Sequence, residues 1–118
     1  YDATLNMEYK VLAKKYSEEA ISKFYLKDKK IFQKNEILKN DIFISPVDIS
    51  DHSISNGNSI MLLNFSRLGM KSNGKELSDS LNAYLNIYKG FMISSLKSID
   101  FFNENLKGIF CTTEGCKI

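Results

Sequence analysis

The densest collection of reactive groups in this chain is the polar run from Asp51 to Ser59. It combines a carboxylate, the only histidine, two amides and several hydroxyls, and it leads directly into the apolar segment 60–68. A helix that is apolar on nearly every side is a buried helix, so we expect a polar loop at the edge of a core. Helix starts carry free N–H groups and a positive dipole end, which suit an anionic or oxygen-rich ligand.

This loop holds more polar groups than one helix start requires, so we expect it to line a ligand site. The candidate ligand-lining residues within it are Asp51, His52, Asn56, Asn58 and Ser59. A structural alternative stays open, because Asn56, Asn58 or Ser59 can cap the helix and Asp51 can bond backbone amides near its positive end. No catalytic residue is assigned, since loop neighbours such as Asp51 and His52 rarely face one another as a catalytic triad requires.

Composition restricts the classes of function. The 118 residues predict one domain or one piece of a larger protein, and 43% hydrophobic with 25% charged residues is typical of a globular chain. A net charge of +2, with Arg67 as the only arginine, does not favour a nucleic-acid partner. No apolar run is long enough for a membrane span. The chain opens on Tyr1-Asp2 without a signal peptide, so we expect it to be trimmed or excised from something longer.

Two cysteines, Cys111 and Cys116, lie close together near the end. Their spacing allows a small disulfide loop but differs from the two-residue spacing of thioredoxin-type redox sites, and we interpret them as a structural thiol pair. One pair cannot complete a tetrahedral zinc site, and no nucleotide-binding motif is present, so we expect neither a metal nor a cofactor. So few cysteines favour a reducing compartment, and therefore a cytoplasmic location.

The elements that must position the loop are helices. Apolar spacing of three and four residues predicts helices at about 4–24, 57–70, 75–92 and 95–105. The fold class is therefore mostly α, with three to four helices in αα-hairpins. Between the first two helices, the runs 31–32 and 42–44 predict either a small β-ribbon or irregular chain. Pro46 and Gly57 are expected as structural turn residues, and Lys71 to Gly74 as the turn between the second and third helices.

The order of these features resembles the C-terminal part of the YyaL family, also called the spermatogenesis-associated protein 20 family. Members join an N-terminal thioredoxin-like domain to an (α/α)6 barrel that is similar to sugar epimerases and six-hairpin glycosidases. Besides the Cys111 and Cys116 pair, the matching positions are Ala13, Ala20, Phe24, Phe32, Pro46, Asp48, Asp51, Gly57, Asn58, Ser59, Leu63, Arg67 and Leu68. Ser55 and Asn56 depart from the family, which usually has Pro and Ser there.

The resemblance implies a place for the polar loop. In such barrels the loops before inner helices line a central funnel, so residues 51–59 would face a carbohydrate-type ligand, with Tyr25 as a stacking surface. The chain would contribute to that funnel without being catalytic alone, whereas the whole protein would have a sugar isomerase, epimerase or glycosidase-like activity. The alternative is a non-enzymatic helical interaction module that forms a homodimer or contacts the rest of its parent protein.

Overall fold

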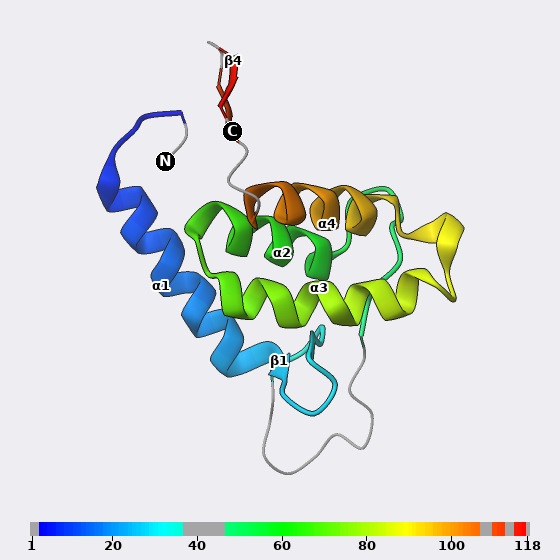
Figure 1. Ribbon diagram of the computed structural model, residues 1–118. Coiled ribbons are helices and arrows are strands. Elements are labelled where there is room, and N and C mark those ends of the chain that lie inside the picture. The colour runs from blue at the N-terminus through cyan, green and yellow to red at the C-terminus, as the bar shows by residue number, and fades with distance from the viewer. Residues whose placement is uncertain (1–2, 37–46, 107–109, 113–114, 118) are drawn as a thin grey trace.

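A computed structural model describes residues 3–36, 47–106, 110–112 and 115–117 (Figure 1). It has four α-helices, α1 (Met7–Phe24), α2 (Gly57–Leu68), α3 (Lys71–Leu85) and α4 (Ile93–Leu106), and a 3-10 turn, η1 (Lys89–Phe91). Two small antiparallel ribbons, β1 with β2 and β3 with β4, complete the described elements. The prediction of a mostly helical chain with a small ribbon is therefore confirmed.

Helices α2 and α4 run parallel, and a side-chain bond at each end fixes their register. Asn56, just before α2, donates to Ser95 Oγ at 3.2 Å, and Asn105 in α4 donates to Ser66 Oγ in α2 at 2.5 Å. Both pairs are 39 residues apart in sequence, so the two helices stay aligned along their whole length. Helix α3 runs back beside both of them (Figure 1).

These three helices and the first ribbon enclose one core. Its buried apolar side chains are Tyr25, Ile31, Phe32, Leu62, Phe65, Leu77, Leu81, Met92, Ile99 and Phe102. Leu77 and Leu81 are fully buried. The apolar stripe that the sequence predicted for α3 therefore faces the core along its first three turns.

The turn between α2 and α3 lies earlier than the sequence predicted. Gly69 has a left-handed φ of 70°, and its N–H bonds back to the carbonyls of Phe65 and Ser66. This is a glycine-based helix C-cap, so the chain reverses at Gly69 and Met70 and α3 begins at Lys71. Gly74, expected in the turn, is instead buried inside α3 against the ring of Phe102.

The first ribbon contains a pairing that the sequence did not predict. Strand β1 (Tyr25–Leu26) pairs with β2 (Ile31–Phe32), with Tyr25 opposite Phe32. Their ring centroids lie 5.1 Å apart, so the hairpin adds an aromatic pair to the core. Tyr25 directly follows α1, which ends at Phe24 as the sequence predicted. The expected strand at 42–44 and Pro46 both lie outside the described residues.

Helix α3 ends at Leu85, earlier than the expected residue 92, and α4 starts at Ile93 rather than 95. Asn86 caps α3, and the 3-10 turn η1 leads to α4. Beyond α4, strand β3 (Phe110–Thr112) pairs with β4 (Gly115–Lys117). The sequence predicted only a short extended tail here.

Helix α1 crosses the outside of the other helices (Figure 1) and packs on them mainly through its C-terminal half. Ala20, Ile21 and Phe24 lie against the core. Its N-terminal half leaves an apolar stripe uncovered, formed by Tyr9 (50% exposed), Leu12 (42%) and Tyr16 (62%). Among the described residues, no helix has both the length and the apolar character needed to cross a bilayer.

Candidate functional site

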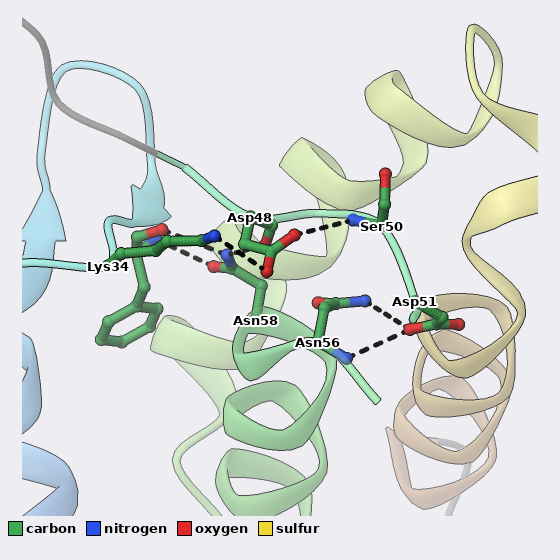
Figure 2. A network of polar contacts seen from close by, with 7 residues as sticks. Lys34, Asp48, Ser50, Asp51, Asn56 and Asn58 are labelled. Carbon is green, nitrogen blue, oxygen red and sulfur yellow. Dashed lines mark hydrogen bonds and ion pairs between the residues drawn. The ribbon is translucent and has the colours of Figure 1, made fainter. Parts of the chain in front are cut away.

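Asp51 is the centre of the polar loop and holds the starts of two helices together. Figure 2 shows its two bonds from Asn56. Its Oδ1 accepts hydrogen bonds from the backbone N–H (3.1 Å) and the side-chain amide (2.9 Å) of Asn56, which precedes α2. The same oxygen accepts a short bond from the hydroxyl of Ser94, and Oδ2 accepts from the Ser94 backbone N–H at 2.7 Å. The carboxylate therefore acts as a cap for α4 supplied from 43 residues away in sequence.

The environment of Asp51 favours its ionised form. Partial burial alone would raise the pKa of this carboxyl, but the hydrogen bonds from Ser94 and Asn56 outweigh that effect and lower the pKa below its ordinary value. The N-termini of α2 and α4 meet at this point, and their positive dipole ends also favour a negative charge.

We expect this carboxylate to make the fold sensitive to acid. Because the folded-state pKa of Asp51 is depressed, its stabilising contribution is complete above the unfolded value of about 4 and is lost as the pH falls through the lower folded value. Urea unfolding of the Asp51→Asn variant should therefore show a smaller loss of stability between about pH 5 and pH 2 than the parent chain. Equal pH profiles for the two chains would contradict this role.

Asn56 is the N-cap of α2 and also the main partner of Asp51. Its side-chain oxygen accepts the N–H of Ser59 at 3.0 Å, as an N-cap should. Its side-chain nitrogen reaches Ser94 and Ser95 as well as Asp51. The side chain is 3% exposed, so its bonding capacity is used inside the protein.

Asn58 connects α2 to the first ribbon. Its oxygen accepts the N–H of Phe32 at 2.9 Å, and its nitrogen donates to the carbonyls of Phe32 (3.1 Å) and Asp48 (3.0 Å). The amide thus pairs with the backbone of β2 much as a neighbouring strand would. Asp48 also accepts the Ser50 N–H and forms an ion pair with Lys34 at 3.4 Å, as Figure 2 shows.

Ser59 is fully buried and completes the network. Its hydroxyl donates to the carbonyl of Asn56 at 2.8 Å and lies 2.8 Å from the hydroxyl of Ser94. Ser94 and Ser95 lie at the predicted start of the last helix, at about residue 95. Two adjacent serines give no sign of a partner in a distant loop, so sequence reasoning could not place them at this site.

The remaining candidates are separate from the network. His52 is exposed, and its side chain makes no hydrogen bond within the described residues. Tyr25 is buried in the core, and its hydroxyl donates to Glu76 at 2.9 Å. Burial, together with that bond to a carboxylate, raises the pKa of Tyr25. Gly57 is the exposed first residue of α2, where the sequence predicted that the loop turns into the helix, and no other atoms lie where its Cβ would be.

An open hollow of about 440 Å³ lies beside the loop, at the C-terminal end of α3. Its lining residues are Lys29, Val47, Ile49, Ser50, Tyr84 and Tyr88. Two tyrosines one helical turn apart provide aromatic surface, and Ser50 and Lys29 provide polar groups. Tyr84 and Tyr88 lie in the helix predicted at 75–92, and their four-residue spacing carries no sign of a hollow.

Comparisons with known proteins give this chain no relative. No protein-family model, curated protein or solved structure matches it. In the described part of the chain, no three His, Cys, Asp or Glu side chains gather as metal ligands would.

Proposed function

We propose that this chain is the C-terminal helical part of a larger protein of the YyaL type, in which further helices of an (α/α)6 barrel cover α1. The observation that carries this proposal is the uncovered stripe of Tyr9, Leu12 and Tyr16 on α1. These residues follow a spacing of three and four, which is the spacing of a helix–helix contact. By contrast, α2, α3 and α4 bury apolar side chains against one another in the core.

In the whole protein, we propose that the loop 51–59 and the hollow at Tyr84 and Tyr88 contribute to a funnel for a carbohydrate-type ligand. Asn56, Asn58 and Ser59 support this funnel from inside, because their polar groups are used in holding the loop. His52, Ser53 and Ser55 are the exposed polar members of the loop. The chain alone would bind such a ligand weakly and would not be catalytic, since the rest of the funnel comes from other hairpins.

The test of a covering helix compares this chain with the longer protein encoded around it. Leu12→Lys should change the stability of the 118-residue chain by no more than about 0.5 kcal/mol, because Leu12 is already half exposed. In the longer protein the same change should destabilise by about 2 kcal/mol, because it places a charge in a helix contact. Lys14→Gln, on the exposed side of α1, is the matched control and should be neutral in both. Equal, small effects of Leu12→Lys in both proteins would contradict the proposal.

The ligand is tested separately by NMR shift mapping with a panel of mono- and disaccharides on both proteins. Shifts at residues 51–55, Tyr84 and Tyr88 in the longer protein are the expected result. An absence of shifts there, with α1 nevertheless covered, would reject the carbohydrate while keeping the helical assembly.

A second function, a non-enzymatic interaction or dimerisation module, is favoured by the same exposed stripe on α1. Leu77 and Leu81 of α3 are buried in the core, so the helix predicted at 75–92 does not offer these residues to a partner. The surface for such a module is therefore α1. Sedimentation equilibrium of the 118-residue chain decides between the two: a dimer that Leu12→Lys dissociates would support the module.

A further inference from the structure

The cysteines near the end of the chain are directly opposite each other in the second ribbon. Strand β3 pairs with β4 so that Phe110 is opposite Lys117, Cys111 opposite Cys116, and Thr112 opposite Gly115. The sequence predicted a structural thiol pair, and its spacing alone could not place the two residues on facing strands. The backbone pairing of β3 with β4 is what places the two cysteines opposite each other.

The position of the pair within the ribbon sets the distance between the two backbones. Only two residues separate Thr112 from Gly115 in sequence, and in a two-residue hairpin the closing pair exchanges the hydrogen bonds. Because bonded and non-bonded pairs alternate along an antiparallel ribbon, Cys111 and Cys116 occupy a non-hydrogen-bonded pair, where Cα atoms lie about 4.5 Å apart. Disulfides join Cα atoms roughly 4.4–6.8 Å apart, so the backbone can accept one without moving.

We propose that Cys111 and Cys116 form a reversible dithiol–disulfide couple that exchanges with glutathione disulfide. The thiolate of one cysteine attacks a sulfur of glutathione disulfide, which releases one glutathione thiolate and leaves a mixed disulfide. The thiolate of the other cysteine then attacks the protein sulfur of that mixed disulfide and releases the second glutathione. The protein loses two electrons and two protons, and one glutathione disulfide becomes two glutathione molecules. The couple uses neither the polar loop nor the hollow, so it is independent of the carbohydrate proposal.

The test places the full chain in a series of glutathione buffers and then measures its free thiols by alkylation and mass spectrometry. The matched control, Cys116→Ser/Lys117→Cys, keeps two thiols in the tail but moves one of them out of register with Cys111. We expect the parent chain to form an intramolecular disulfide at a ratio of glutathione disulfide to glutathione at least about ten-fold lower than the control, because its thiols have the higher effective concentration.

Two further measurements test the proposal: the accumulation of mixed disulfides and the helical signal in circular dichroism. The control should accumulate mixed disulfides with glutathione, whereas the parent should pass through them without accumulation. Circular dichroism should show the same helical signal in the reduced parent, the oxidised parent and Cys111→Ser/Cys116→Ser, because the core lies in α2, α3 and α4. The proposal would be overturned if parent and control were half-oxidised at the same ratio of glutathione disulfide to glutathione. It would also be overturned if mixed disulfides with glutathione were the final product of the parent.

Discussion

Replacing Gly74 by valine is expected to destabilise the protein by about 3 kcal/mol, because α3 packs at this point directly on the ring of Phe102. A Cβ on residue 74 would lie 2.9 Å from Phe102 Cζ and 3.0 Å from Cδ2, and closer still to Cε2. Phe102 is itself 2% exposed and cannot move into solvent without opening the core. The loss should appear as a lower urea concentration at the midpoint of unfolding, while the dependence of the unfolding free energy on urea concentration stays unchanged.

Gly57→Ala is the matched control for Gly74→Val. Residue 57 also belongs to a helix, but open space surrounds the position of its Cβ, so we expect it to be neutral or to stabilise by up to about 1 kcal/mol through helix propensity and reduced unfolded-state entropy. Phe102→Leu supplies a second check, because leucine lacks the outer ring atoms. The double variant Gly74→Val/Phe102→Leu should lose less than the sum of the single losses, and strict additivity would show that the clash is not the cause.

Asn58→Ala is expected to cost about 2–4 kcal/mol, because it leaves the buried N–H of Phe32 without its partner and removes the donor to two carbonyls. Phe32 is 5% exposed, so water cannot easily replace the lost amide. Loss of this contact should also loosen the β1–β2 ribbon from α2, which hydrogen exchange at the Phe32 amide would report.

Asn82→Ala is the control for Asn58→Ala. Asn82 lies on the exposed side of α3, so its replacement by a better helix former should be neutral or slightly stabilising. If Asn58→Ala behaved like Asn82→Ala in both urea unfolding and Phe32 exchange, Asn58 would not be a structural connector. The loop would then have a polar group to offer to a ligand, as the sequence had suggested.

These expectations change the interpretation of the polar loop. The sequence predicted that four side chains of this loop face a ligand, with helix capping as the alternative: Asp51, Asn56, Asn58 and Ser59. In the fold, each of these four side chains bonds another part of the same chain. Any ligand at this end of the bundle would therefore meet the exposed His52 and the tyrosines of the hollow.

The sequence by itself determined the features that depend on near neighbours. The three- and four-residue apolar spacing located the four helices, and Asn56 was expected among the caps of α2 because an N-cap bonds an N–H only three residues away. Only the tertiary structure decided the rest. Asp51 caps α4 across 43 residues, Phe32 pairs with Tyr25, and Gly74 continues α3 because its missing side chain admits Phe102. Each of these depends on a partner distant in sequence, and local periodicity carries no information about which distant groups meet when the chain becomes compact.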